Sequence, residues 1–512
     1  MNSSIPKTIL FRADANAAIG SGHLMRCLAL AQACSEKQMK TIFVLSSSSK
    51  EASGSKMLNG LDIRFVNAEP GQLNDLMQTA ELADRHQASW IVTDGYHFGE
   101  SWYRNLKDRG HRTLCIDDGA HLPFYYSEIV LNQNIHADEH RYQNRSPQTR
   151  LLLGSAYILL RNEFLKHPDR MRKFPDQGKR ILITMGGSDP HNTTLDVLKW
   201  LSKLPIPDLA ADVVLGPSNP YFREIGLFLS QVPFIYRIHR NTANMASLMA
   251  HADLAISSAG TTSWEMAYMG VPSLLIAIAE NQYPVAEKLD SLGAAFYLGR
   301  SGEISPERAQ QEIMRLIGSP GLQEKRKCIG QALVDGMGRE RVVREMVRSR
   351  IELRRAEEGD CRMIYNWAND SNVREASFSS ETISWDTHVK WFRNKLKDPK
   401  CEMYIARNEE GEQLGQVRFE MDRNDAVISV SLSPSFRNKG YGREIIEMGT
   451  RKILATKNVK QVRALIKKDN FASIRAFEKA SFEKSRLDEC SGEQAFCLVY
   501  RKQSGENHAH HH

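Results

Sequence analysis

The sequence predicts an α/β protein with two similar parallel-sheet lobes followed by a smaller domain of mixed α/β structure. From residue 8 to about 135, short apolar runs alternate with helical patterns, as in a doubly wound sheet. The pattern restarts at residue 180, after a proline-rich basic stretch, and a different glycine motif follows residue 351. We expect an N-terminal lobe over 1–170, a second lobe over 171–345, a third domain over 351–502 and a disordered tail or tag remnant over 503–512.

The composition is that of an ordinary globular protein. Of 512 residues, 41% are hydrophobic and 25% are charged. Because no apolar run reaches the length of a membrane span and the first residues do not form a signal peptide, we expect a cytoplasmic protein without a membrane partner. The formal charge of +7 is spread along the chain, which suits small anionic substrates better than nucleic acid. The eight cysteines show no metal-binding spacing, so we expect reduced thiols and no metal.

A glycine loop and the start of a helix follow the first apolar strand. Gly20 and Gly22 allow a sharp turn close to a ligand, and the N–H groups of the new helix favour an anion. His23, Asp14 and Arg26 add an imidazole, a carboxylate and a fixed cation. Three such groups together indicate catalysis, since an imidazole exchanges protons near neutral pH. The structural alternative is a tight turn with a capping histidine.

Polar residues also stand at the carboxyl ends of further predicted strands, where open α/β sheets bind their ligands. They are Asp94, Tyr96, Asp117, Asp118 and Asn132. Helix capping or a turn explains any single aspartate equally well, but several at equivalent strand ends indicate a binding site. Tyr96 and Asn132 are the expected substrate contacts among them.

Two loops of the second lobe predict a nucleotide site. Gly187 and Ser188 follow one strand, and Gly260 and Thr261 follow another and precede a helix. Small residues let backbone N–H groups close on a diphosphate. Glu265, one turn into that helix, could accept hydrogen bonds from both ribose hydroxyls; a solvated helix carboxylate is the alternative.

The third domain contains a strand over 427–433 that ends at a proline and leads into the motif R-x-x-G-x-G at a helix start. Successive backbone N–H groups there would form a nest for a pyrophosphate, strengthened by Arg437 and Lys439. The expected cofactor contacts are Leu432, Arg437, Asn438, Lys439, Gly440, Tyr441, Gly442, Asn470 and Ser473.

The N-terminal motif R-A-D-x-x-x-x-I-G-x-G-H-x-x-R-C-L-x-L-A resembles the opening of the UDP-2,4-diacetamido-2,4,6-trideoxy-β-L-altropyranose hydrolases of pseudaminic acid biosynthesis, which have the two-lobed GT-B scaffold. The similarity covers about the first 340 residues and continues at 94–96, 117–118, 131–134 and 153–164. The resemblance implies that Glu265 binds the ribose of UDP. It also implies that Asn281 and Gln282 lie near the diphosphate and the sugar.

Residues 351–502 resemble the GCN5-related N-acetyltransferases, which implies acetyl-CoA as cosubstrate. The segments 367–370 and 383–392 are similar to the branch that contains pseudaminic pathway and ribosomal-protein acetyltransferases. Many members have a tyrosine, thought to protonate the leaving thiolate, where this chain has Phe477. Phenylalanine has no proton to donate, so either water, Tyr441 or another group acts as the general acid, or the thiolate leaves unassisted.

Together the resemblances imply a bifunctional enzyme. It would acetylate the 4-amino group of UDP-4-amino-4,6-dideoxy-N-acetyl-β-L-altrosamine and then hydrolyse UDP-2,4-diacetamido-2,4,6-trideoxy-β-L-altropyranose to the free sugar and UDP. His23 would orient or deprotonate the water, Asp14 would orient His23 or bind the sugar, and Arg26 would balance charge. The alternatives are a MurG-like glycosyltransferase fused to a protein N-terminal acetyltransferase, and a nucleotide-sugar sensor without activity. The expected partners are the two small molecules, and the sequence does not define the oligomeric state.

Overall fold

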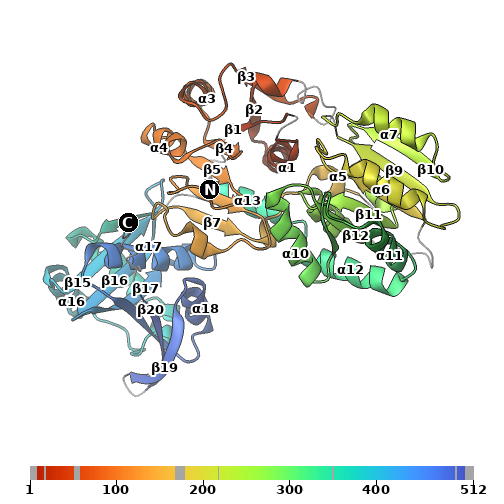
Figure 1. Ribbon diagram of the computed structural model, residues 1–512. Coiled ribbons are helices and arrows are strands. Elements are labelled where there is room, and N and C mark those ends of the chain that lie inside the picture. The colour runs from red at the N-terminus through yellow and green to blue at the C-terminus, as the bar shows by residue number, and fades with distance from the viewer. Residues whose placement is uncertain are drawn as a thin grey trace, which may run out of the picture. The chain divides into compact units, whose positions relative to one another are not determined.

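The computed structural model describes residues 8–16, 19–50, 58–167, 179–216, 218–348, 351–490 and 493–501. The chain forms two compact units, Met1–Val347 and Arg348–His512. In Figure 1 the first unit runs from red to green and the second is blue. The expected tail over 503–512 and most of the expected crossing between lobes at 166–179 lie outside the described residues.

The first lobe is built on a parallel sheet with the strand order β3-β2-β1-β4-β5-β6-β7. Its strands are β1 (Thr8–Ala13), β2 (Lys40–Ser46), β3 (Asp62–Val66), β4 (Trp90–Asp94), β5 (Thr113–Ile116), β6 (Ile129–Asn132) and β7 (Arg150–Leu153). Every residue of β1, β4, β5 and β6 is buried, which explains their continuous apolar sequences. β1 pairs with β2 on one side and with β4 on the other, so the chain direction across the sheet switches between β1 and β4.

Helices α1 (Gly22–Glu36), α3 (Leu73–Arg85) and α4 (Glu100–Asp108) belong to this lobe. The helix α13 (Gly338–Met346) comes from the far end of the unit, yet its residues Val342 and Val343 share a hydrophobic core with Leu24 of α1. The charged stretch 322–350 therefore contains two helices, α12 (Pro320–Leu333) and α13, and the second of them packs on the first lobe.

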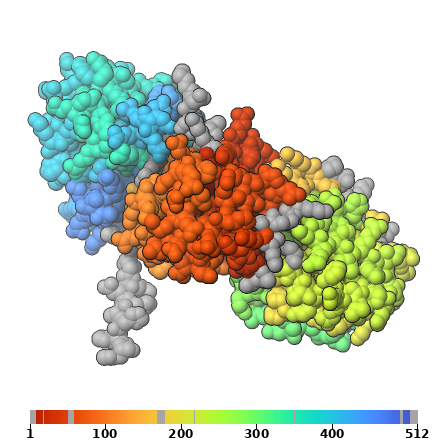
Figure 2. Space-filling view, turned by 90° about the horizontal axis from the view of Figure 1, so that it is seen from above, coloured from red at the N-terminus to blue at the C-terminus, as the bar shows by residue number. Residues whose placement is uncertain are grey.

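The second lobe repeats the topology with the strand order β10-β9-β8-β11-β12-β13. Its strands are β8 (Arg180–Thr184), β9 (Ala210–Leu215), β10 (Ile235–Arg240), β11 (Leu254–Ser258), β12 (Ser273–Ala277) and β13 (Phe296–Arg300). Its helices are α6 (Thr193–Ser202), α7 (Phe222–Leu229), α8 (Met245–His251), α9 (Thr262–Met269), α10 (Tyr283–Ser291), α11 (Pro306–Ile317) and α12. The short helix α5 (Asn162–Leu165) leaves the first lobe and packs here through Phe164. Figure 2 shows the first lobe in orange and the second in yellow and green.

The second unit has one sheet with the order β14-β15-β16-β17-β18-β20-β19. Its strands are β14 (Glu352–Arg355), β15 (Cys401–Arg407), β16 (Gln413–Asp422), β17 (Asp425–Leu432), β18 (Gln461–Lys467), β19 (Glu483–Cys490) and β20 (Glu493–Arg501). Its helices are α14 (Cys361–Ala368), α15 (Ser371–Ala376), α16 (Trp385–Lys397), α17 (Tyr441–Thr456) and α18 (Phe471–Lys479). The parallel pair β17–β18 is joined only from Asp425 to Val427, so the sheet opens beyond that point.

Candidate active site

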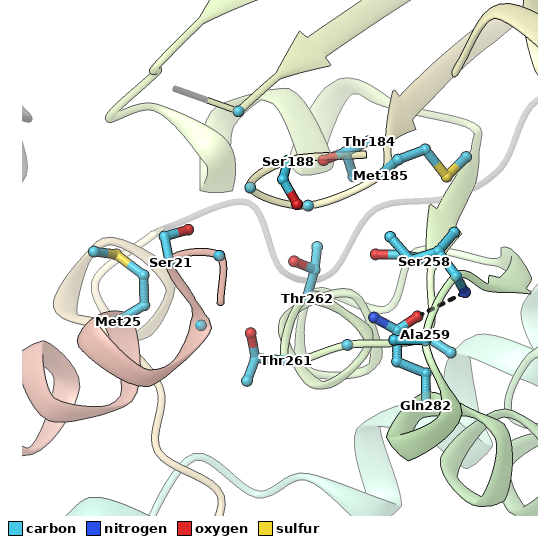
Figure 3. A pocket seen from close by; sticks show the side chains of 18 of the residues that line it. Ser21, Met25, Thr184, Met185, Ser188, Ser258, Ala259, Thr261, Thr262 and Gln282 are labelled. Carbon is cyan, nitrogen blue, oxygen red and sulfur yellow. Dashed lines mark hydrogen bonds between the residues drawn. The ribbon is translucent and has the colours of Figure 1, made fainter. Parts of the chain in front are cut away.

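A pocket of about 340 Å³ lies between the two lobes of the first unit. The loop before α1 forms one side, and the loops after β8 and β11 form the other (Figure 3). The two sides nearly touch, since a Cβ atom at Gly187 would lie 3.0 Å from the Ser21 backbone nitrogen and one at Gly22 would lie 3.8 Å from Thr261 Oγ1. The pocket is therefore bounded by the switch points of both sheets, which is where parallel sheets bind ligands.

Most of the predicted residues of the first unit meet in this pocket. Those that line it are Gly20, Gly22, His23, Arg26, Gly187, Ser188, Gly260, Thr261, Glu265, Asn281 and Gln282. Tyr96 lies at its edge, hydrogen-bonded to Asn281. Asp14 and Asn132 do not line the pocket.

His23 and Arg26 lie one turn apart on α1 and share the carboxylate of Asp94, at the end of β4. His23 Nδ1 is 2.5 Å from Asp94 Oδ1, and Arg26 donates from Nη2 to the same oxygen at 2.7 Å and from Nε to Oδ2 at 2.8 Å. Arg26 Nη1 also donates to Asp118 Oδ1 at 2.6 Å. Asp94 thus engages Nδ1 of the imidazole, which leaves Nε2 for a ligand.

Charge pairing fixes the ionisation of the groups around His23. Burial acts to raise the pKa of Asp118, but the Arg26 guanidinium holds that pKa well below its usual value. Burial likewise acts to lower the pKa of Arg26, and the carboxylates of Asp118 and Asp94 raise it above its usual value. The cluster therefore keeps one cation, Arg26, between two carboxylates.

Tyr96 links this cluster to the second lobe. Its hydroxyl donates to Asp118 Oδ2 at 3.0 Å and accepts from Asn281 Nδ2 at 3.0 Å. Burial of the phenol and the neighbouring Asp118 raise the pKa of Tyr96, so the hydroxyl remains protonated. A chain of hydrogen bonds thus crosses the cleft from Arg26 to Asn281.

Asp14 lies in a separate buried network and does not orient His23, which corrects that expectation. Its carboxylate accepts from Arg12 Nη1 at 2.6 Å and from the Ser46 backbone nitrogen at 2.6 Å. Burial acts to raise the pKa of Asp14, but Arg12 and Ser46 hold it below its usual value. Asp94, on the neighbouring strand, occupies the position beside His23.

Asn132 supports the site from behind, which corrects its assignment as a substrate contact. Its amide donates to the Asp118 carbonyl oxygen at 3.3 Å and to the Tyr142 hydroxyl at 2.8 Å. Asn134, two residues on, lines the pocket and donates to Asp118 Oδ1 at 2.8 Å. Both amides therefore hold Asp118 in place.

The N-termini of α1 and α9 both border the pocket. Their N-cap residues, Ser21 and Thr261, make no capping hydrogen bond through their side chains within the described part of the chain. The first N–H groups of both helices are therefore suited to an anion such as a diphosphate. Figure 3 shows Ser21 and Thr261 on opposite sides of the pocket, with Ser188 above them.

Glu265 is buried one turn into α9 and pairs with Arg161, which donates from Nη2 to Glu265 Oε1 at 2.9 Å. Burial raises the pKa of Glu265, and Arg161 opposes that change. Gln282 Oε1 accepts from the Ile278 backbone nitrogen at 3.1 Å, which fixes the loop after β12 (Figure 3).

Sequence reasoning missed the roles of Asp94, Asn134 and Arg161. Asp94 is in the group of strand-end residues, but no local signal distinguishes it from Asp14 as the partner of His23. Asn134 and Arg161 stand within the segments that resemble the hydrolases, and that resemblance is the signal that could have found them.

In the second unit, the predicted nest lies at the start of α17. Asn438 and Gly440 have φ angles of 60° and 82°, in the left-handed region. Such turns orient successive N–H groups toward an anion. A Cβ atom at Gly442 would lie 3.4 Å from Leu432 Cδ1, so the helix start is close to the end of β17.

The side chains of two predicted cofactor contacts bind other residues of the second unit. Arg437 Nη1 lies 2.7 Å from Asp370 Oδ1, and its Nε and Nη2 each donate to the Leu432 carbonyl at 3.3 Å. Asn470 Oδ1 accepts from the Ser473 backbone nitrogen at 3.1 Å and caps α18. Arg437 and Asn470 therefore both bind other residues of the second unit, and their role as cofactor contacts stays a prediction.

Phe477 and Tyr441 also have defined surroundings. Phe477 is buried and packs edge-on against Phe482, with 5.0 Å between ring centroids. The Tyr441 ring lies 5.8 Å from Phe436, and burial raises the pKa of its hydroxyl.

Comparisons with known proteins agree with the fold. Residues 350–483 match the Acetyltransferase (GNAT) domain family, and residues 213–337 match the Glycosyltransferase family 28 C-terminal domain. These matches confirm the predicted fold: a GT-B-like pair of lobes followed by a GNAT domain. Among solved structures, MurG of Acinetobacter baumannii is 15% identical, with a TM-score of 0.47, and covers 67% of this chain and 99% of its own.

Three curated proteins are similar to parts or most of this chain. The chain is 24% identical to the UDP-2,4-diacetamido-2,4,6-trideoxy-β-L-altropyranose hydrolase of Campylobacter jejuni. The match covers 56% of this chain and 97% of that hydrolase. The chain is 30% identical to the spore coat polysaccharide biosynthesis protein SpsG of Bacillus subtilis. This match covers 42% of this chain and 62% of SpsG. An uncharacterized protein of Methanocaldococcus jannaschii, MJ1062, is 23% identical over 92% of this chain and 96% of its own.

The predicted resemblance is therefore confirmed: the chain joins a region homologous to nucleotide-sugar hydrolases to a GNAT acetyltransferase domain. The matches support hydrolase and N-acetyltransferase activity in one chain, with acetyl-CoA as the cosubstrate of the GNAT domain. Within the described ranges, no helix is long and apolar enough to cross a membrane. The same residues contain no group of three or more His, Cys, Asp or Glu side chains that could hold a metal ion.

Proposed function

We propose that the protein performs two steps on one nucleotide sugar in the cytoplasm. The GNAT domain acetylates the 4-amino group of a UDP-4-amino-4,6-dideoxy-N-acetyl-β-L-altrosamine, and the first unit hydrolyses the resulting UDP-2,4-diacetamido-2,4,6-trideoxy-β-L-altropyranose. The observation that carries this proposal is the His23–Asp94–Arg26 cluster at the start of α1, which faces the N-terminus of α9 across one pocket.

The second lobe would hold UDP. The N–H groups at the start of α9 suit the diphosphate, and Glu265 would accept hydrogen bonds from the ribose. The sugar would then extend toward the first lobe, where Tyr96 and Asn281 meet. Ser188 and Gly187, on the loop after β8, border the same space.

His23 would act as the general base of hydrolysis. With Nδ1 engaged by Asp94, Nε2 would take a proton from water as its oxygen bonds to the anomeric carbon. The bond from that carbon to the phosphate oxygen breaks, and UDP leaves with the electron pair. The net negative charge of Asp94, Asp118 and Arg26 would stabilise the imidazolium formed in this step.

In the GNAT domain, catalysis would rest mainly on positioning. A backbone N–H of the open end of β17 would polarise the thioester carbonyl, and the start of α17 would bind the pyrophosphate. Phe477 has no proton to donate and is buried against Phe482, so the thiolate takes a proton from another group or from water, or it leaves unassisted.

The hydrolase step is tested by supplying the purified protein with the diacetamido UDP-sugar and following it by phosphorus NMR. We expect release of UDP, not UMP, and no requirement for a sugar acceptor. Persistence of the substrate would contradict the proposal.

The GNAT step is tested with Gly440→Glu. A side chain at this left-handed position, and its negative charge in the nest, should abolish coenzyme A binding, measured by titration calorimetry, while hydrolysis is unchanged. Retained coenzyme A binding would contradict the assigned nest.

A glycosyltransferase is the second candidate, because the match to the Glycosyltransferase family 28 C-terminal domain covers the nucleotide-binding lobe. Such an enzyme would release UDP only when a sugar or lipid acceptor is added. An acceptor requirement in the NMR assay would therefore favour it.

A further inference from the structure

The guanidinium of Arg348 lies beside the predicted cofactor nest of the second unit. Arg348 is the first residue of that unit and stands two residues before the segment 350–483 that matches the GNAT family. A Cβ atom at Gly440 would lie 3.7 Å from Arg348 Nη2 and 4.0 Å from its Nη1. A cation from outside the matched segment is therefore next to the turn whose N–H groups suit a pyrophosphate.

Two contacts hold this guanidinium along the first turn of α17. It lies 4.8 Å from the centroid of the Tyr441 ring, and its Nη2 is 2.9 Å from Glu444 Oε2. The side chains of Arg348 and Glu444 are each 17% exposed, whereas Gly440 is an exposed residue that a ligand can reach. The ring contact and the ion pair therefore keep a cation at the edge of an accessible nest.

The two cations of the motif R-x-x-G-x-G itself have other contacts. Arg437 pairs with Asp370 at 2.7 Å. Lys439 Nζ lies 5.3 Å from the centroid of the Phe436 ring. A pyrophosphate in the nest needs more positive charge than the partial charges of backbone N–H groups supply, and the structure places the guanidinium of Arg348 beside that nest.

We propose that Arg348 exchanges Glu444 for the pyrophosphate of acetyl-CoA when the cofactor binds, an inference that rests on the proposed binding of the pyrophosphate at the start of α17. A guanidinium donates short, charge-assisted hydrogen bonds to phosphate as well as to carboxylate oxygens. The pyrophosphate carries more negative charge than one carboxylate, and the N–H groups of the nest hold it in place. Glu444 lowers the affinity for the cofactor, because it competes for Arg348 and repels the pyrophosphate.

Arg348→Gln and Glu444→Gln test this exchange, because the proposal gives them opposite effects. Loss of the guanidinium should raise the Kd for coenzyme A about 10-fold, measured by titration calorimetry with the full chain. Loss of the competing carboxylate should lower that Kd about threefold. Damage to a purely structural ion pair would weaken binding in both variants. The exchange is refuted if Arg348→Gln keeps the wild-type Kd, or if Glu444→Gln does not bind coenzyme A more tightly.

The probe 3′-dephospho-coenzyme A identifies the phosphate that Arg348 binds. It keeps the pyrophosphate and lacks the 3′-phosphate, so Arg348→Gln should weaken its binding by the same factor as that of coenzyme A. A loss confined to coenzyme A would assign Arg348 to the 3′-phosphate and refute the pyrophosphate contact. Arg344→Gln is the matched control: this exposed arginine stands four residues earlier, and its loss should leave both Kd values unchanged.

The variant Gly440→Glu keeps this test separate from the proposed function. If Gly440→Glu abolishes coenzyme A binding while Arg348→Gln keeps the wild-type Kd, the nest is supported and only the role of Arg348 is refuted. If Gly440→Glu retains the wild-type affinity, the nest is wrong, and the pyrophosphate contact of Arg348 is refuted with it. A wild-type protein that binds no coenzyme A would refute both.

Discussion

The two lobes of the first unit share a topology but place opposite chemistry at their switch points. After β1 and β4, the first lobe presents charged side chains held by short ion pairs: His23, Arg26 and Asp94. After β8 and β11, the second lobe presents small residues and helix N–H groups. This contrast is the basis of our proposal that the first lobe carries out the reaction and the second binds the nucleotide.

His23→Ala should have the largest effect, because it removes the proposed base and leaves the second lobe intact. We expect kcat for UDP release to fall about 1,000-fold. The affinity for UDP, measured by calorimetry, should stay within a factor of two. Equal losses of kcat and UDP affinity would contradict the assignment of catalysis to the first lobe and of nucleotide binding to the second.

Asp94→Asn should reduce kcat about 100-fold with little change in KM, because an amide can still bind Nδ1 but no longer stabilises the imidazolium. Asp14→Asn is the matched control on the neighbouring strand. It should lower the melting temperature, since Arg12 loses a charged partner, while kcat of the folded protein stays near the wild-type value. The account fails if Asp14→Asn lowers kcat as strongly as Asp94→Asn.

Glu265→Gln tests whether the second lobe binds the nucleotide. The amide weakens the hydrogen bonds to the ribose and removes one of the two carboxylates that pair with Arg161, so KM for the UDP-sugar should rise about 10-fold while kcat changes less than threefold. Steady-state kinetics measures both constants. A loss confined to kcat would place Glu265 in the chemical step instead.

Gly187→Ala tests the close contact between the loops of the two lobes. The new Cβ atom would lie 3.0 Å from the Ser21 nitrogen, so the loops must separate slightly and kcat/KM should fall about fivefold. Gly226→Ala, in helix α7 with nothing within 4 Å of its Cβ position, should leave kcat/KM unchanged. Equal effects of the two substitutions would show that the contact between the loops is unimportant.

The smallest effect concerns stability at low pH. The pKa of Asp118 is lowered in the folded state, so its contribution to the free energy of unfolding is present above about pH 4 and is lost as pH falls further. Asp118→Asn should therefore be less stable than the wild type at pH 7 by about 1–3 kcal/mol, with the difference shrinking below pH 4. Denaturant unfolding measures it, and a difference that stays constant down to pH 3 would contradict the assigned pairing.

The glycine loops and buried strands were predictable from the sequence because they depend on local patterns. Continuous apolar runs marked β1 and β4, and Gly187 and Gly260 marked the loops that border the pocket. The sequence did not mark β7, because this edge strand has one buried residue and its apolar run, Leu151–Leu153, is only three residues long.

Pairings between distant residues could not be predicted. Asp94 and Asp14 both follow strands at the same sheet edge, and which of them meets His23 depends on the direction of α1. Arg437 matched a phosphate motif, but Asp370, distant in sequence, pairs with it.

The most direct test of the two-step proposal is a time course by proton and phosphorus NMR with the UDP-4-amino-4,6-dideoxy sugar, with and without acetyl-CoA. We expect acetylated sugar nucleotide to form first and UDP to follow, with UDP appearing only when acetyl-CoA is present. The variant His23→Ala should accumulate the acetylated nucleotide without releasing UDP. Release of UDP from the unacetylated substrate, or acetylation that no UDP release follows in the wild type, would contradict the proposed sequence of reactions.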